Sequence, residues 1–347
     1  MKQQKTSSKT SDHYQIPYDF GLGGVPIGNE FTAVTDTEAQ QTLEAAWKAG
    51  VRYYDTSPWY GLGLAERRFG QFLHNQNRED YVISSKVGKL LKASKKAKKS
   101  NLFPLAGSPN IVEFDYSADA VRRSIEDSLQ RLGIDSLDIV FVHDLSPDNK
   151  YLEGNWLKHF EMAKQGAFPE LTRMREEGLI KAWGLGVNRP EPILATIEVA
   201  DPDIFLLASQ YSLIDHQYAL KHVFPEIRKK NIRLVMGSAL NAGFISGSNR
   251  FNYGHEMPAE YMSKRRRLSA IATAHGVDLR TAALQFAAMP DVAAAVLCGA
   301  RTAKQITEDA RSMKVKIPAD FWSELKAEKL ISEEAPIKIH RSPVQSY

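Results

Sequence analysis

Four residues that can take part in proton transfer follow short apolar segments in the first half of the chain. Asp55 ends VRYYD, with Tyr60 five residues later; Lys86 ends YVISSK, and His143 ends LDIVFVH. A free phenol, with a pKa of about 10, exchanges protons poorly near neutrality. A neighbouring ammonium lowers that pKa, and a carboxylate keeps the ammonium charged and in place. Together with an imidazole that orients a substrate oxygen, these groups predict alcohol–carbonyl interconversion that needs no metal.

The spacing of the apolar residues explains how these four side chains could meet. Short apolar runs alternate with segments of helical periodicity, as where YVISSK precedes SADAVRRSIEDSLQRLG, and eight such units can be traced. This alternation implies parallel strands, and near-continuous apolar strands imply a sheet covered on both faces. We therefore predict a single-domain α/β protein, a (β/α)8 TIM barrel, with a doubly wound open sheet as the alternative. In a barrel the carboxyl ends of neighbouring strands converge on one rim.

The expected boundaries are a disordered tail over 1–18, the barrel over 19–330 and a C-terminal arm over 331–347. Two long connections, 87–116 after the third strand and 239–258 after the seventh, interrupt the regular pattern. Loops of such length are usually functional lids or disordered. The lysines from Lys89 to Lys99 are interpreted as a solvated loop, with attraction of an anionic substrate or partner as the alternative.

The composition argues against several classes of protein. With 43% hydrophobic and 25% charged residues, the chain has the composition of a soluble globular protein. A formal net charge of +4 argues against a dedicated nucleic-acid binder. No long apolar span or secretion signal is present, so we expect a cytoplasmic protein without a membrane partner. The single cysteine, Cys298, allows no intrachain disulfide and is interpreted as a core residue.

The chain resembles the aldo-keto reductase superfamily from about residue 21 to about residue 328. The motifs that carry the resemblance are AGVRYYDTSPWYG, ISSKVG, DSLQRLGIDSLDIVFVHD, EEGLIKAWGLGVN and LCGARTAKQITED. The resemblance implies that Asp55, Tyr60, Lys86 and His143 are the family's catalytic tetrad. Any one of the four alone would more often be structural, but all four at the expected strand ends is a specific pattern.

Within the superfamily, the chain is most similar to the branch of aldose 1-dehydrogenases and pyridoxal 4-dehydrogenases. The resemblance implies an NAD(P)-dependent enzyme, active as a monomer or homodimer, that oxidises the cyclic hemiacetal of a small sugar to a lactone. Trp59 and Asp144 are the expected substrate residues, since sugar faces stack well on indole. The alternatives are a pyridoxal dehydrogenase or general aldehyde reductase of the same family and, from another class, a non-catalytic nicotinamide-binding sensor or scaffold.

The family's cofactor positions carry over unevenly. Gln210 matches a glutamine that holds the nicotinamide amide, Asn188 stands one place beyond the usual Ser-Asn pair, and the tyrosine often stacked on the nicotinamide falls at Gly237. The other positions implied for the cofactor are Ser238, Leu240 and Asn241 along the pyrophosphate, and Gly299, Arg301, Gln305, Glu308 and Asp309 along the adenosine. The Lys and Arg that many relatives use on a 2′-phosphate fall at Gly299 and Gln305, which slightly favours NAD over NADP. Binding of a 2′-phosphate by Arg301 and Lys304 is the alternative.

Overall fold

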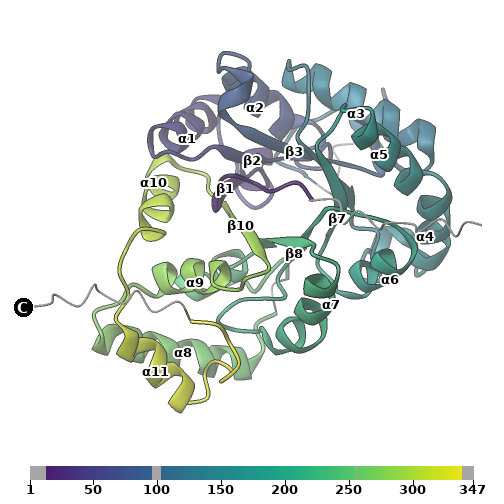
Figure 1. Ribbon diagram of the computed structural model, residues 1–347. Helices are drawn as coiled ribbons and strands as arrows, with labels where there is room; N and C mark the ends of the chain where they lie inside the picture. Colours follow the sequence, from purple (N-terminus) through teal and green to yellow (C-terminus); the bar gives the residue numbers. More distant parts are fainter. Residues whose placement is uncertain (1–12, 96–102, 255, 338–347) are drawn as a thin grey trace, which may run out of the picture.

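Eight parallel strands close into a barrel in the computed structural model, which describes residues 13–95, 103–254 and 256–337 (Figure 1). Around the barrel the order is β1-β10-β9-β8-β7-β6-β3-β2, closed by hydrogen bonding between β1 and β2. The strand bounds are β1 Phe20–Gly23, β2 Tyr53–Asp55, β3 Val82–Val87, β6 Ile139–His143, β7 Ala182–Val187, β8 Ile204–Ala208, β9 Arg233–Gly237 and β10 Ala293–Gly299. The predicted (β/α)8 barrel is confirmed, and the open-sheet alternative is wrong.

Helices surround the barrel and cover its outer face (Figure 1). Their bounds are α1 Asp36–Lys48, α2 Leu64–Leu73, α3 Ala118–Leu132, α4 Trp156–Gln165, α5 Ala167–Glu176, α6 Glu191–Val199, α7 Phe224–Lys229, α8 Ala259–Ala274, α9 Leu279–Ala288, α10 Ala303–Ser312 and α11 Ala319–Ala327. Local signals fix several ends: Thr35 and Glu38 form a capping box before α1, and Gly133 ends α3 in a left-handed conformation. None of the described helices is long and apolar enough to cross a membrane.

The inside of the barrel is filled by side chains, so the fold encloses a packed core and not a pore. The inward-facing cluster comprises Tyr53, Val82, Ile139, Phe141, Ala182, Ile204, Leu206, Ala208, Val235, Ala295 and Leu297. Tyr14, Ile16 and Tyr18 pack against this cluster, so the segment before β1 covers the amino end of the barrel. Because that end is filled, the opposite rim, where the strands end, is left for chemistry.

The segment 13–18 is anchored to the barrel, although we expected disorder over 1–18. His13 is buried, and its Nδ1 lies 3.2 Å from Asp203 Oδ1. The same carboxylate accepts hydrogen bonds from Arg175 and from the backbone N–H of Trp183. Residues 1–12 lie outside the described part of the chain.

The His13–Asp203 contact should make stability depend on pH. The hydrogen bond to Asp203 raises the pKa of His13 above its usual value, against the opposing effect of burial. A raised folded-state pKa gives stability that is fully present below the unfolded pKa of about 6.5 and is lost as pH rises through the folded pKa. We expect His13→Asn to destabilise the protein more at pH 6 than at pH 9 in urea unfolding. His222→Asn changes an exposed histidine and is the control, for which we expect no such pH dependence. An equal loss of the free energy of unfolding in His13→Asn at both pH values would contradict the prediction.

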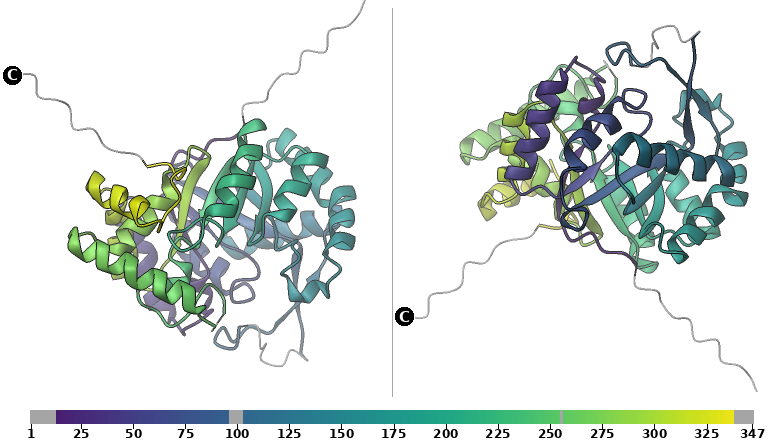
Figure 2. Two further views of the ribbon diagram at one scale, coloured as in Figure 1. Left: turned by 90° about the horizontal axis from the view of Figure 1, so that it is seen from below. Right: turned by 90° about the horizontal axis from the view of Figure 1, so that it is seen from above.

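The connection after β3 contains a β-hairpin, so the interpretation of its lysines as a solvated loop is wrong for Lys89, which is buried, whereas Lys92 and Lys95 are exposed. Strands β4 (Lys89–Ala93) and β5 (Asn110–Phe114) pair antiparallel and extend from the end of the barrel opposite to residues 13–18 (Figure 2). Lys89, at the base of the hairpin, is only 2% exposed, whereas Lys92 is solvent-exposed and pairs with Glu113. Lys96, Lys98 and Lys99 lie outside the described residues.

The first part of the expected C-terminal arm also packs on the barrel. Ile331 and Ala335 are buried, and the backbone N–H of Ser332 donates to Nε2 of the buried His216 at 3.0 Å. Burial lowers the pKa of His216 to about 4, so at neutral pH its Nε2 stays free to accept this bond. Residues 338–347 lie outside the described part of the chain.

Candidate active site

A buried ion pair joins the ends of β2 and β3. Lys86 Nζ donates to Asp55 Oδ2 at 2.7 Å and to the Thr56 carbonyl at 2.8 Å, and Ser84 Oγ donates to Asp55 Oδ1 at 2.7 Å. The register explains the contact: Asp55 pairs with Ser84, and Lys86, two residues further along β3, points to the same face. Burial lowers the pKa of Lys86, while Asp55 acts in the opposite direction.

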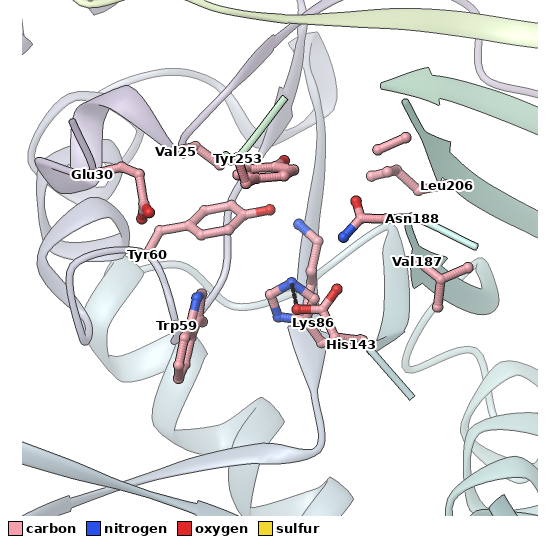
Figure 3. Close-up of a pocket in the computed structure, with 13 residues that line it drawn as sticks. Val25, Glu30, Trp59, Tyr60, Lys86, His143, Val187, Asn188, Leu206 and Tyr253 are labelled. Atoms are coloured by element: carbon pink, nitrogen blue, oxygen red, sulfur yellow. Dashed lines mark ion pairs between the residues drawn. The ribbon is translucent and has the colours of Figure 1, made fainter. Parts of the chain in front are cut away.

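Tyr60 and His143 complete the predicted tetrad at the same rim (Figure 3). Lys86 Nζ lies 4.6 Å from the centroid of the Tyr60 ring, and the rings of Tyr60 and His143 are 5.7 Å apart and perpendicular. His143 Nδ1 is 3.1 Å from Ser57 Oγ, which leaves Nε2 towards the pocket. Burial lowers the pKa of His143 well below its usual value, so the imidazole is neutral. The structure thus brings together all four residues that the sequence predicted at strand ends.

The protonation of Tyr60 differs from our expectation. We expected Lys86 to make the phenol more acidic, but burial, reinforced by the charge of Asp55, raises the pKa of Tyr60 well above its usual value. Lys86 Nζ lies 4.6 Å from the centroid of the Tyr60 ring, and Asp55 balances its charge at 2.7 Å. Tyr60 is therefore a protonated phenol at neutral pH, the form that donates a proton to a carbonyl oxygen.

A small pocket of about 190 Å³ opens above these residues. Its lining residues are Val25, Glu30, Trp59, Tyr60, Lys86, His143, Asp144, Gly186, Val187, Asn188, Leu206, Ala208 and Tyr253. The structure therefore places Trp59, Asp144 and Asn188 in the wall, where the sequence analysis expected substrate or cofactor contacts. The sequence analysis missed Glu30 and Tyr253, which come from irregular loops and belong to no periodic segment.

Asp144 and the buried Lys89 form a second ion pair beside His143. Lys89 Nζ lies 2.5 Å from Asp144 Oδ2, and the same oxygen is 3.5 Å from His143 Nε2. Lys89 Nζ also lies 4.2 Å from the centroid of the Trp59 ring. Burial alone would raise the pKa of Asp144, but His143 and Lys89 outweigh it and hold this pKa at about 2. Asp144 is thus ionised, and its carboxylate faces the pocket.

A larger groove of about 440 Å³ adjoins the pocket, and both share Tyr60 and Tyr253 in their walls. Of the expected cofactor residues, those that line the groove are Ser238, Leu240, Gly299, Arg301, Gln305 and Asp309. Gln210, Asn241 and Glu308 are not among its lining residues. Gln210 Nε2 donates to the Asn188 carbonyl, Asn241 is buried against Asn252, and Glu308 accepts from Arg280.

The residues present in the groove fit a dinucleotide. Three guanidinium groups, of Arg250, Arg280 and Arg301, lie in its wall and suit the anionic pyrophosphate. A Cβ at Gly299 would come within 2.9 Å of Pro26, so glycine keeps this part of the groove open. Arg250 and Arg280 were missed by the sequence analysis, because an arginine in a loop or a helix carries no signal of its own.

Tyr253 covers the junction of the two cavities. Gly237 leaves the position of the expected stacking tyrosine without a side chain, and Tyr253, from the loop after β9, lies over the site instead. Its ring stacks on Phe31 at 6.4 Å. Burial raises the pKa of Tyr253 to about 12, so it is a neutral phenol.

Comparison with known proteins agrees with this fold. The sequence profile described as the aldo/keto reductase family matches residues 19–329. A D-threo-aldose 1-dehydrogenase from a Pseudomonas species is 35% identical over 321 residues, covering 90% of this chain and 94% of the relative. A pyridoxal 4-dehydrogenase from Microbacterium luteolum is 34% identical over 328 residues, with the same coverage of each chain.

Solved structures show the same fold at lower sequence identity. The holo form of an aldo-keto reductase from Bacillus halodurans superimposes with a TM-score of 0.68 at 21% identity, covering 93% of this chain and 95% of that one. An aldo/keto reductase from Klebsiella pneumoniae in complex with NADP and acetate gives a TM-score of 0.62 at 18% identity, covering 91% and 92%. The chain therefore belongs to the aldo-keto reductase family. It is an NAD(P)-dependent oxidoreductase acting on CH–OH groups, so the sensor or scaffold alternative is set aside.

Proposed function

We propose that the protein is an aldose 1-dehydrogenase, which oxidises the cyclic hemiacetal of a sugar to a lactone. The observation that carries the proposal is the meeting of Tyr60, Lys86 and His143 where the small pocket joins the dinucleotide groove. A volume of about 190 Å³ lies below the usual range for drug-sized ligands and suits a single ring. The 35% identical relative named as an aldose dehydrogenase supports the choice of substrate.

Each residue of the tetrad has a distinct proposed part in the reaction. His143 Nε2–H donates to the substrate oxygen and orients it, and the Tyr60 hydroxyl group exchanges the proton of that oxygen. Asp55 holds Lys86 beside the Tyr60 ring. A nicotinamide bound in the groove would supply the hydride acceptor for oxidation, or the hydride donor for reduction, at the substrate carbon. The family cofactor would be held along the groove by Ser238, Arg250 and Arg301, among other residues.

A substrate panel tests this proposal. Purified protein is mixed with NAD+ or NADP+ and with a series of aldoses, pyridoxal and simple alcohols, and reduced nicotinamide is followed by absorbance. We expect the highest kcat/KM with an aldose. Preferred turnover of pyridoxal would instead support the alternative of a pyridoxal dehydrogenase, and preferred reduction of simple aldehydes would support a general aldehyde reductase.

Cytoplasmic localisation and a monomeric or homodimeric state stay predictions.

We further propose that NAD is preferred over NADP. Arg280 is engaged by Glu308 at 3.1 Å and Asp309 at 3.4 Å, and Arg301 donates to Thr32 Oγ1 at 2.9 Å. The carboxylates of Glu308 and Asp309 balance the charge of Arg280, and they would repel a 2′-phosphate placed beside them. We expect kcat/KM to be at least about tenfold higher with NAD+ than with NADP+, a difference of about 1.4 kcal/mol.

A single substitution on α10 tests the basis of this preference. Gln305 stands where many relatives carry a cation. Gln305→Arg should therefore raise kcat/KM for NADP+ and reduce the ratio of kcat/KM with NAD+ to kcat/KM with NADP+. Gln71→Arg makes the same change on the exposed face of α2 and should leave the ratio as in the wild type. Equal use of both cofactors by the wild type would contradict the proposal.

A further inference from the structure

Glu30 is a carboxyl group in the pocket wall that the proposed chemistry does not use. It lies in the loop between β1 and α1 and is half-buried. Its carboxyl group makes no hydrogen bond or ion pair with another described residue, so its oxygens remain available to a ligand. Burial raises the pKa of Glu30 to about 7, although the charges of Lys89 and Arg250 act to lower it. Figure 3 shows Glu30 at one end of the pocket and Asn188 at the other.

The loop that carries Glu30 is held in place by a buried arginine. Arg68, on α2, is 7% exposed and donates to the carbonyls of Ile27 and Val34 at 2.7 and 2.6 Å and to Asn29 Oδ1 at 2.8 Å. These bonds fix the backbone on both sides of Glu30. The carboxyl group is therefore presented by a rigid support, as a recognition site requires.

Asp144 supplies a second carboxylate to the same pocket, beside His143. Its backbone has a φ of 46°, a left-handed conformation that a non-glycine residue adopts at an energetic cost. Asn149 Nδ2 donates to the Asp144 carbonyl at 2.8 Å, and Lys89 holds the carboxylate at 2.5 Å. A strained residue kept in place by a buried ammonium and an amide is positioned for contact with a ligand.

We propose that Glu30 and Asp144 together form a hydroxyl-recognition site that selects a ring substrate bearing several hydroxyl groups, an aldose, over pyridoxal or an unsubstituted hemiacetal. This inference rests on the proposed function and names the feature of the substrate that the pocket recognises. Asp144 is ionised at neutral pH, and Glu30, with a pKa of about 7, is ionised above that pH. An ionised carboxylate only accepts hydrogen bonds, and a sugar hydroxyl donates one. Trp59 and Asn188, which also line the pocket, carry N–H groups that can donate to hydroxyl oxygens.

The selectivity follows because a substrate without ring hydroxyl groups would leave the carboxyl groups of Glu30 and Asp144 without hydrogen-bond donors. A ring without hydroxyl groups would exclude water from the two carboxylates without replacing the lost hydrogen bonds. Sites built to bond a substrate hydroxyl reject analogues that lack it far more strongly than apolar pockets reject a missing methylene. Lys89 takes no part in binding here; it is a positioning residue that keeps Asp144 ionised and in place.

The test compares an aldose with tetrahydropyran-2-ol, a cyclic hemiacetal that undergoes the same oxidation but has no other hydroxyl group. Above about pH 8, where Glu30 is ionised, we expect Glu30→Gln to lower the aldose-to-tetrahydropyran-2-ol ratio of kcat/KM by about tenfold or more, as loss of a charged hydrogen bond predicts. Glu198→Gln, on the exposed face of α6, is the matched control and should leave the ratio at its wild-type value. Thermal unfolding establishes that each variant is folded.

A series of aldoses that each lack one ring hydroxyl locates the contact. In the wild type, removing the hydroxyl that Glu30 binds should lower kcat/KM about tenfold or more, and in Glu30→Gln the same removal should have a much smaller effect. An unchanged ratio in Glu30→Gln, or a loss of pyridoxal turnover alone, would overturn this inference while leaving aldose oxidation intact. Absence of turnover of any aldose by the wild type would instead overturn the proposed function, and the inference with it.

Discussion

Replacing Tyr60 by phenylalanine should lower kcat/KM about 10²- to 10⁴-fold, the usual contribution of a positioned proton-transfer group. The substitution removes only the hydroxyl group. It keeps the ring face over which Lys86 Nζ lies at 4.6 Å, so the neighbouring ion pair keeps its surroundings. Cofactor binding, followed by quenching of protein fluorescence, should remain as in the wild type. Tyr218→Phe, at an exposed position between β8 and α7, is the control and should retain full activity.

The pH profile gives this prediction a second readout. Burial raises the pKa of Tyr60 well above its usual value, so near neutrality the phenol holds its proton. Oxidation of a hemiacetal needs the deprotonated form, so kcat/KM for oxidation should rise with pH. Reduction of a carbonyl needs the protonated form and should not rise. Full activity of Tyr60→Phe, or residual oxidation with the wild-type pH profile, would exclude Tyr60 as the proton-transfer group.

The tetrad could be predicted because local sequence places each of its residues. Asp55 and His143 each end an apolar strand and Lys86 is the last residue but one of β3, and strand ends of a parallel barrel lie on one rim whatever the loops do. Tyr60 follows Asp55 after a short turn, so its position is also set locally. The same periodicity that predicts the barrel therefore predicts where its reactive side chains meet.

The remaining pocket residues could not be predicted, because contacts distant in sequence place them. Glu30 stands in an irregular loop whose path is set by Arg68, from another helix. Lys89 begins a lysine-rich run, typical of a solvated surface, and only its pairing with Asp144, 55 residues away, shows that it is buried. The raised pKa of Tyr60 likewise depends on the burial that the assembled site produces, which the spacing of charged residues does not reveal.

Lys86→Met should cause the largest loss of stability among the tetrad substitutions. The side chains of Lys86 and Asp55 are 2% and 4% exposed, and their charges compensate each other at 2.7 Å. Removing the ammonium leaves Asp55 as a buried carboxylate with Ser84 as its remaining side-chain donor. Breaking a buried pair in this way costs roughly 3–5 kcal/mol of the free energy of unfolding. Urea unfolding at pH 7 measures the loss.

Two further variants separate this charge effect from the loss of a lysine side chain as such. Lys86→Met combined with Asp55→Asn removes both charges, so it should recover part of the lost stability because no uncompensated ion remains. It should still be inactive, since the groups that support Tyr60 are gone. Lys92→Met breaks an ion pair with Glu113 in which the lysine side chain is 57% exposed. It should change the free energy of unfolding by no more than about 1 kcal/mol. If Lys86→Met were no more destabilising than Lys92→Met, the ion pair at the ends of β2 and β3 would serve catalysis without stabilising the rim.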